Sequence, residues 1–436
     1  MSRVARFLAL VLTVSFLCMP LFGDQLSENR TTFKLILKAV SHEIEKNYYD
    51  PQMRGIDWSA ATAEANERIE KAQNVTDMAR AIWILTNKLK DSHTGFVPPG
   101  RAITFQFGFD AKPIGNEVRV YKIRKGGEAE KAGLKVGDRL LKVNTFSANR
   151  ASFDDMMFFF RVIANMSVME IVYQRDNEQP QTIRLQGKQK TEAAILDTER
   201  FIDSLWELIR ESQRDEYKWH SANYDGIGYA QLRSFDEEED FLLKVIRNSD
   251  PSKGLVIDLR DNGGGAEDTL KSVAGHFVSS PTVMFKLQLR KGPEDVVIKP
   301  RAPRIEVPVV ILVDSETGSA AEMFARFMQL QNHAVVVGDH SSGRVMRSRV
   351  SFEQVGAGSV IPYLLSITTA RVVMADGQAL ENVGVKPDVE CIPLGKDMRE
   401  EEDACLGKAL SLVRKAAGMP EPAKEPAKEE KAGGGI

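Results

Sequence analysis

A run of glycines is the first feature of this chain that could do chemistry. Residues 253–265 read as an apolar strand that ends in three glycines, and residues 266–277 have a helical pattern. Adjacent glycines leave backbone N–H groups uncovered, so that a ligand can approach closely. Such a loop can hold a phosphate or the oxyanion of an acyl-transfer intermediate. A phosphate loop needs a Gly-Lys-Ser/Thr ending, which residues 265–267 (Gly-Ala-Glu) lack, and the motifs farther along the chain favour acyl transfer.

Ser319 is the candidate nucleophile. It follows a buried strand predicted at 308–314 and opens a helix, where free N–H groups and the helix dipole favour negative charge. Gly318 and Ala320 leave it uncrowded. Most serines at a helix start are N-caps, however, and Ser315 could cap as easily. On position alone the capping interpretation is therefore favoured.

An α/β domain must position these residues. From residue 226 onward strand and helix patterns alternate, which favours a sheet with substantial parallel pairing. Residues 31–90 show apolar spacings of three and four that predict helices, one of them starting at 75–77. In the core we predict strands at 227–232, 308–314 and 334–338 and helices at 237–248 and 319–331.

Composition restricts the class of protein. The 436 residues are 43% hydrophobic and 27% charged, as in a soluble globular protein of two or three domains. A net charge of −3 without any basic run argues against nucleic-acid binding. Cys391 and Cys405 are the two cysteines expected in the mature chain, and they either form a disulfide or stay free thiols.

The first residues have the layout of a signal peptide. Arg3 and Arg6 precede an apolar run at 7–19, which is too short for a comfortable membrane span, and a cleavage region comes next at 20–23. A lipoprotein signal at Cys18 ranks second because the residue before it is bulky. An uncleaved anchor is the alternative, and it would also place the rest of the chain outside the cytoplasm.

Short strands with turn signals fill the region from 101 to 188. Residues 132–144 read Ala-Gly-Leu-x-x-Gly-Asp-x-Leu-Leu-x-Val-Asn, which closely resembles a PDZ domain. Phe107, Gly108 and Phe109 are similar to the PDZ carboxylate-binding loop, which presents N–H groups to a peptide C-terminus. The resemblance implies that an extended peptide is added to a sheet edge. The alternative is a domain that only packs as a lid.

The chain as a whole resembles the tail-specific (C-terminal processing) serine peptidases and their tricorn-like relatives. The resemblance covers nearly the whole mature chain. Besides the PDZ insert it rests on Asp-Ser-His-Thr at 91–94, Gly-Tyr-Ala at 228–230, the glycine motif at 258–265, Gly-Ser-Ala-Ala-Glu at 318–322 and Glu-Asn-Val-Gly-Val-Lys-Pro-Asp at 381–388. By resemblance, Ser319 falls on the family nucleophile.

One residue departs from the Ser-Lys branch of this family. The lysine of that branch lies in a Gly-Lys-Gly segment downstream of the serine, where this chain has Arg344. Arginine cannot be deprotonated in a protein, so it cannot serve as the general base. The tricorn-like branch, which uses Ser, His and Glu with a helper Ser, has a matching residue here for each role.

The resemblance to that branch implies the roles. His93 would take the proton from Ser319, because its ordinary pKa suits a base near neutral pH. Glu381 would orient His93 and stabilise its charged form, and Ser92 would contact the oxyanion or orient the acid. The oxyanion hole would be formed by backbone N–H groups of Gly263 or Gly264 and of Ala320.

Each of these roles has an alternative. His93 could be structural, since lysine-dependent relatives often carry Asp-x-His-Thr as well, and Glu381 and Ser92 could belong to turns. His340 is a rival base with a poorer match to the family. Acids near a strand end, as at 258–268, more often pair with a neighbour such as Arg260 than bind a metal, so no metal or cofactor is expected.

The sequence thus predicts an α/β multidomain protein with a signal peptide at 1–23, an N-terminal helical region at 24–100, an inserted β-rich PDZ domain at 101–188, an α/β serine peptidase core at 189–418 and a disordered tail at 419–436. The expected function is that of an exported serine endopeptidase, periplasmic or otherwise extracytoplasmic. Its partners would be unfolded polypeptides or those with accessible C-termini; attachment to a membrane and the oligomeric state stay open. The alternative, motivated by Arg344, is a catalytically inactive adaptor that binds peptide C-termini.

Overall fold

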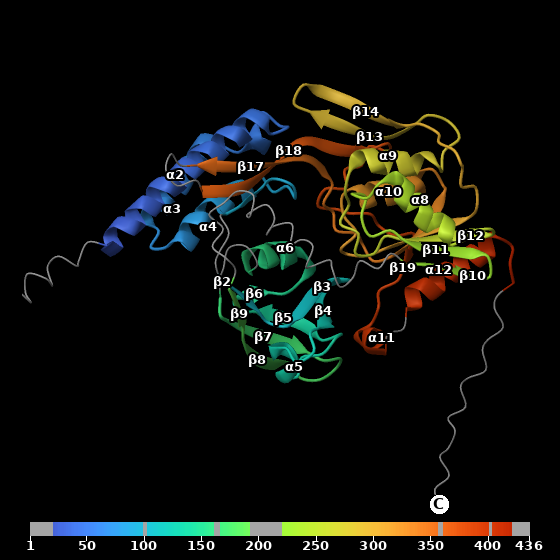
Figure 1. The fold of residues 1–436 in the computed structure, drawn as a ribbon, viewed down its shortest axis with the longest axis horizontal. Coiled ribbons are helices and arrows are strands. Elements are labelled where there is room, and N and C mark those ends of the chain that lie inside the picture. Colours follow the sequence, from blue (N-terminus) through green and yellow to red (C-terminus); the bar gives the residue numbers. More distant parts are fainter. Residues whose placement is uncertain are drawn as a thin grey trace, which may run out of the picture.

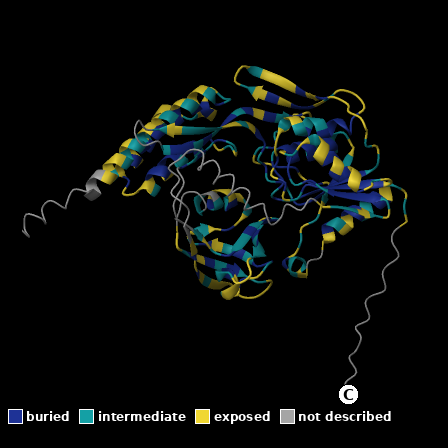
Figure 2. Ribbon diagram, in the orientation of Figure 1, coloured by how far each residue is buried: buried dark blue, intermediate teal, exposed yellow. Residues whose placement is uncertain are grey.

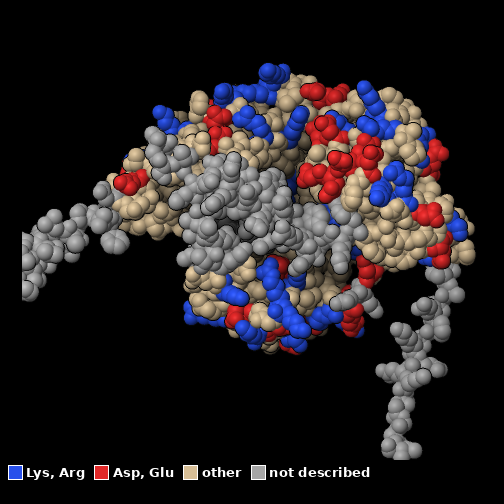
Figure 3. Space-filling view, in the orientation of Figure 1, with Lys and Arg blue, Asp and Glu red and all other residues tan. Residues whose placement is uncertain are grey.

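The computed structural model describes residues 21–98, 103–160, 166–191, 220–355, 361–400 and 403–420. The predicted signal peptide and the predicted tail lie almost entirely outside these ranges and stay predictions. Among the described residues, no helix is long and apolar enough to cross a membrane. On the face drawn in Figure 3, basic side chains are scattered among acidic ones, in keeping with the small net charge.

The N-terminal region is helical, as its apolar spacing predicts. It consists of α2 (Leu21–Asn47), the 3₁₀ turn η1 (Met53–Gly55), α3 (Trp58–Lys71) and α4 (Val75–Asn87). The side chains of Asp57 and Asn74 cap α3 and α4 by accepting backbone N–H groups of the first turn. The helices pack on the long strand β18 (Ile361–Met374), and Ile44 and Ile82 are fully buried there (Figure 1).

A β-rich insert, residues 103–191, comes next in the chain. A ribbon of β2 (Ile103–Gln106) and β9 (Lys188–Thr191) leads into and out of it. Its antiparallel sheet has the order β3 (Phe109–Ile114), β4 (Glu117–Ile123), β5 (Arg139–Val143), β7 (Val168–Gln174) and β8 (Gln181–Gln186), with β6 (Phe146–Ser147) beside β5. Helices α5 (Glu128–Lys131) and α6 (Arg150–Phe158) add Ala129 and Met156 to the core of the insert. β3 is an edge strand, and no other described strand pairs with its outer edge.

The core contains the predicted parallel sheet. The strand order is β10 (Ser221–Tyr224), β11 (Ile227–Gln231), β12 (Gly254–Asp258), β15 (Val309–Val313), β16 (Ala334–Gly338) and β19 (Val389–Glu390), parallel from β11 onward. Because the carboxyl ends of β12 and β15 meet at one edge of the sheet, the glycine motif and the loop that leads to Ser319 lie side by side.

Helices cover both faces of this sheet. On one face lie α8 (Glu239–Asn248), α9 (Glu267–Gly275) and α10 (Ala320–Leu330), and on the other lies α12 (Ala404–Ala416). Leu255 and Ile257 pack toward the first group, whereas Val256 between them packs toward α12. Strands buried on both faces read as continuous apolar runs, which is why the sequence predicts them well (Figure 2).

An antiparallel sheet that the sequence pattern does not predict joins the helical region to the core. Its order is β1 (Gly95–Val97), β18, β13 (Thr282–Leu289) and β14 (Gly292–Ile298), and β17 (Met346–Val355) also pairs with β18. β18 has 14 residues and runs from the N-terminal helices to the core (Figure 1). Its pairing with β1 anchors the segment immediately before β1, which contains His93.

Candidate active site

Ser319 occupies a strained turn between β15 and α10. Its φ of 50° and ψ of −117° lie in a region that residues other than glycine rarely adopt. Such strain persists only where the surroundings hold it, and it is frequent at active sites. Gly264 packs against the serine: a Cβ atom at Gly264 would lie 2.6 Å from Ser319 Cβ, and the φ of +112° at Gly264 also favours glycine.

Glu322 fixes this turn. Its carboxylate is fully buried and accepts the N–H of Ser319 at 3.0 Å, in the manner of a capping box. It also receives hydrogen bonds from the residues after β16, namely from the Ser341 and Ser342 hydroxyls and the N–H groups of Gly343 and Arg344. Burial raises the pKa of Glu322, and these hydrogen bonds oppose that rise. Glu322 therefore ties residues 341–344 to the serine.

His93, Ser92 and Glu381 form a relay. Ser92 Oγ lies 2.7 Å from His93 Nδ1 and donates to Glu381 Oε2 at 2.9 Å, and the Ser92 N–H donates to Glu381 Oε1 at 2.7 Å. A hydroxyl has one proton to donate, and Ser92 donates it to Glu381, so Nδ1–H of His93 is the donor to Ser92. This assignment leaves Nε2 of His93 unprotonated, the state that a general base requires.

The sequence assigns Glu381 the role of orienting His93 but does not specify the order of contacts in this relay. Among the described residues Glu381 makes no hydrogen bond to the ring, and Ser92 stands between them. Burial lowers the pKa of His93 to about 4; the charge of Asp91 opposes this effect and the charge of Arg344 adds to it. Burial raises the pKa of Glu381, and its hydrogen bonds oppose that rise.

The serine turn and the relay meet at residues 344 and 345. The C=O of Arg344 accepts the N–H of Ser319 at 3.0 Å, and the N–H of Val345 donates to Glu381 Oε2 at 2.9 Å. No hydrogen bond joins Ser319 Oγ to the His93 ring among the described residues. The structure therefore brings these groups into one site without the contact that proton transfer needs, and such contacts often tighten only when substrate is bound.

The side chain of Arg344 lies within this site. Its guanidinium is 3.7 Å from a Glu316 carboxylate oxygen, and both side chains are about one-third exposed, at 36% and 34%. Burial raises the pKa of Glu316 to about 7, although Arg344 opposes that rise. Arg344 carries its charge at any working pH, so it adds a fixed cation whose charge acts on His93, but no base.

The candidate oxyanion donors differ in their availability. The N–H of Gly264 donates to the buried Asn262 side chain at 2.9 Å. The N–H groups of Gly263 and Ala320, in contrast, donate to no other described residue. The C=O of Asn262 also accepts the N–H of Gly318 at 2.8 Å, which fastens the glycine motif to the serine turn. Of the two glycines named from the sequence, Gly263 has the free donor.

The predicted carboxylate-binding loop lies at the start of β3. Gly108 has a φ of +82°, and a Cβ there would approach the backbone of residues 127 and 128 to 3.2 Å. The C=O groups of Phe107 and Gly108 accept N–H groups of Ala129 and Arg124. The N–H groups of Phe107 and Gly108 donate to no other described residue, and Phe109 begins the edge strand.

His276 and His340 make structural contacts in the described part of the chain. His276 is buried, with its ring between the Pro303 C=O and Glu239. The backbone of His340 is bound by Asp339 and Arg150, and among the described residues its ring makes no hydrogen bond to Ser319. No cluster of three or more potential metal ligands occurs in the described part of the chain.

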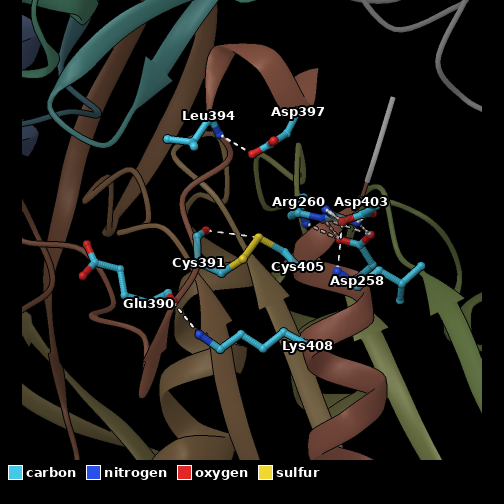
Figure 4. The surroundings of a disulfide bond; sticks show 10 residues. Asp258, Arg260, Glu390, Cys391, Leu394, Asp397, Asp403, Cys405 and Lys408 are labelled. Atoms are coloured by element: carbon cyan, nitrogen blue, oxygen red, sulfur yellow. Dashed lines mark hydrogen bonds and ion pairs between the residues drawn. A yellow bond between two sulfur atoms is a disulfide. The ribbon is translucent and has the colours of Figure 1, made fainter. Parts of the chain in front are cut away.

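Cys391 and Cys405 form a disulfide, one of the two states left open by the sequence (Figure 4). It joins the end of β19 to the first turn of α12. Beside it Arg260 pairs with Asp258 at 2.6 Å and with Asp403 at 2.7 Å. The pair of Asp258 with Arg260 is the one that the sequence predicts.

Sequence reasoning missed several residues of the site. Glu322 lies three positions after Ser319, and the capping-box pattern could have assigned it a role. Lys112 had no such signal, because its partners Asp261 and Asp314 are 149 and 202 residues away in the sequence. Lys112 extends from the β-rich insert into the site, and there its side chain contacts Asp261 and Asp314 of the core.

Comparisons with known proteins match two parts of the chain to family models. Residues 226–391 match peptidase family S41, and residues 30–87 match the Tricorn protease C1 domain. The carboxy-terminal processing protease CtpA of Bacillus subtilis is 23% identical over 324 residues, which cover 71% of this chain and 63% of CtpA. A probable CtpA-like serine protease of Staphylococcus aureus is 24% identical over 342 residues, covering 74% of this chain and 62% of the relative. The chain thus spans less than two-thirds of these curated relatives.

Two solved structures share the fold. Mature CPAF complexed with lactacystin superposes with a TM-score of 0.66 at 15% identity, covering 89% of this chain and 99% of CPAF. The photosystem II D1 C-terminal processing protease gives a TM-score of 0.50 at 19% identity, covering 86% and 98%. Residues 226–391 are thus similar to peptidase family S41 and residues 30–87 to the Tricorn protease C1 domain, and the chain shares the fold of these two solved structures.

Proposed function

We propose that this protein is an exported serine endopeptidase in which Ser319 is the nucleophile and His93 the general base. The observation that carries the proposal is the hydrogen-bonded relay from Glu381 through Ser92 to His93, which leaves Nε2 of the histidine as the proton acceptor. The strained backbone of Ser319 and the match of residues 226–391 to peptidase family S41 support it. Arg344 excludes the lysine-dependent alternative at this position.

The reaction would proceed by acyl transfer. His93 Nε2 takes the hydroxyl proton of Ser319 as Oγ attacks the peptide carbonyl, and the N–H groups of Gly263 and Ala320 donate to the oxyanion. The imidazolium, stabilised by Glu381 through Ser92, then gives its proton to the leaving amine. His93 takes a proton from a water molecule as that water attacks the acyl-enzyme, and then returns the proton to Ser319 Oγ as the acid product leaves.

The β-rich insert would capture the substrate as a PDZ domain does. The N–H groups of Phe107 and Gly108, which donate to no described residue, can donate to a terminal carboxylate, and the outer edge of β3 can take an extended peptide as an added strand. Substrates would then be unfolded polypeptides or proteins with accessible C-termini. Export rests on the signal-peptide layout of residues 1–23.

Cleavage of an unfolded polypeptide tests this function. The purified protein is incubated with a reduced and alkylated carrier protein, and the products are identified by mass spectrometry. We expect cleavage by the wild type and by Ser280→Ala, a control at an exposed serine, but not by Ser319→Ala. An adaptor would instead leave the carrier intact while binding its C-terminus, and Ser319→Ala would then retain the function in the cell.

A further inference from the structure

One cation from the β-rich insert enters the loops of the candidate active site. Lys112, on the edge strand β3, extends its side chain out of the insert and is 14% exposed. Its Nζ donates to Asp261 Oδ1 at 2.5 Å and to Asp314 Oδ2 at 2.8 Å. Asp261 lies two residues before Gly263, and Asp314 begins the loop that ends at Ser319. Lys112 therefore bridges the oxyanion loop and the nucleophile loop.

Asp314 is the centre of this junction. Its Oδ1 accepts the N–H of Asp261 at 3.0 Å and the N–H groups of Glu316 and Thr317, each at 3.1 Å. One carboxylate thus holds the backbone of both loops, while Lys112 occupies its second oxygen. A shift of either loop would move the N–H of Gly263 relative to Ser319 Oγ.

The charges at the junction depend on Lys112. Burial raises the pKa of Asp261 and the charge of Asp314 adds to that rise, while Lys112 opposes it. Burial also acts to raise the pKa of Asp314. The charge and hydrogen bond of Lys112, together with the N–H of Asp261 and the charge of Arg260, outweigh it and lower that pKa to about 2. Without Lys112, two adjacent carboxylates would repel each other when both are ionised.

Other charged groups face the pair but do not replace Lys112. Arg233 is 3.6 Å from Asp261 Oδ2, and Arg260 acts on Asp314 while it pairs with Asp258 and Asp403. Glu316 adds further negative charge nearby. Of these groups, Lys112 alone contacts both carboxylates in the described structure.

Docking of the insert does not depend on Lys112. Arg150 Nη2 donates to Asp339 at 2.5 Å, the Gly115 N–H donates to the same carboxylate at 2.8 Å, and Ser315 Oγ donates to the Pro113 C=O. A cavity of about 340 Å³ adjoins Lys112, so water can fill space left by a neutral side chain. Substitution of Lys112 is therefore compatible with an intact fold.

We propose that Lys112 is a positioning residue of the acyl-transfer site, supplied by the β-rich insert, which holds the oxyanion loop and the nucleophile loop in register. The role rests on the proposed function of Ser319. It makes the peptidase domain incomplete without the insert, in addition to any part that the insert takes in binding substrate.

The test compares Lys112→Met, Lys112→Arg and the double variant Lys112→Met/Asp261→Asn with the wild type. The readout is the rate of labelling by a serine-reactive phosphonate across pH. We expect Lys112→Met to label more slowly by about 10²-fold where both acids are ionised, the order of loss that a small misplacement of reacting groups produces. The ratio to the wild-type rate should recover as pH falls, because one carboxyl takes up a proton and the repulsion ends.

The compensating variants separate this role from a merely structural one. Lys112→Arg should restore most of the rate, and Asp261→Asn should rescue Lys112→Met at every pH by removing one charge. Equal labelling rates of Lys112→Met and wild type overturn the proposal. A slower rate in Lys112→Met that neither a change of pH nor Asp261→Asn restores overturns it as well.

Failure of the proposed function would give a different result. A wild type that is never labelled overturns the role of Ser319, and with it the catalytic importance of Lys112. Amide hydrogen exchange in residues 261–265 and 314–319 then reports the junction alone. Faster exchange in Lys112→Met, reversed in the double variant, supports the bridge between the loops, and unchanged exchange overturns it.

Discussion

The sequence names all four residues of the proposed proton-transfer chain, Ser319, His93, Ser92 and Glu381. It does not show which of them contact each other. Side-chain type and motif order point to the residues that could transfer a proton. They do not show that Ser92 stands between Glu381 and His93, since the hydrogen bond from Ser92 to Glu381 joins positions 289 residues apart. Nor do they show that Glu322 joins the serine turn to Arg344.

Replacement of Arg344 should alter pH dependence rather than abolish activity. Burial lowers the pKa of His93 to about 4; the charge of Asp91 opposes this effect, and the charge of Arg344 adds a smaller lowering. The base works when neutral, so activity is lost as pH falls through this pKa. In Arg344→Met the pKa should rise, and the acid limb of the labelling rate should move to higher pH, while the plateau remains.

Arg347→Met is the matched control, because Arg347 is 48% exposed and pairs only loosely with Glu267 at 3.7 Å. Its rate–pH profile should match that of the wild type. Loss of the plateau in Arg344→Met would contradict the account and would show that the guanidinium takes part in the reaction itself.

Among the structural elements, the turn that carries Ser319 depends on Gly264 for close approach. A Cβ at Gly264 would lie 2.6 Å from Ser319 Cβ, whereas one at Gly263 would meet nothing within 4 Å. Gly264→Ala should cost roughly 1–3 kcal/mol of stability and should abolish labelling, because the serine must move. Gly263→Ala keeps its N–H, so both its stability and its labelling should stay close to those of the wild type. Chemical denaturation and labelling measure the two effects, and equal behaviour of the variants would be inconsistent with this packing.

The disulfide fastens α12 to the end of β19. It closes a loop with a sequence separation of 14, for which loop-closure entropy gives about 3 kcal/mol of stabilisation. Cys391→Ala/Cys405→Ala should lower the free energy of unfolding by about that amount in denaturant titrations. Reductant should lower the stability of the wild type toward that of the variant. If the unfolding midpoint of the wild type equals that of the variant and does not change with reductant, the disulfide does not stabilise the fold.

For the molecule as a whole, the sequence predicts the parallel core and the N-terminal helices but not the antiparallel sheet. β12 and β15 are buried on both faces and read as apolar runs. β17 is half-exposed along most of its length, so its pattern is weak, and β1 pairs with a strand about 270 residues away. Contacts between the insert and the core, such as Lys112 with Asp314 across 202 residues, leave no local signal.

Capture of C-termini by the insert can be measured by calorimetry with Ser319→Ala, which avoids cleavage. A peptide with an apolar, free C-terminus should bind at least about tenfold more tightly than its C-terminal amide, because a hydrogen bond to a charged group contributes about 1.5–3 kcal/mol. Gly108→Val should reduce binding, since its backbone has a φ of +82°. Equal affinity for acid and amide would contradict recognition of a carboxylate and would favour a lid.

Labelling of Ser319 with an active-site serine phosphonate, read by intact mass and peptide mapping, tests the central claim most directly. We predict one adduct on Ser319 in the wild type and in Arg344→Ala, none in Ser319→Ala, and much slower labelling in His93→Ala. The absence of an adduct in the wild type, with and without a C-terminal peptide for the insert, would contradict the claim and would favour a catalytically inactive adaptor.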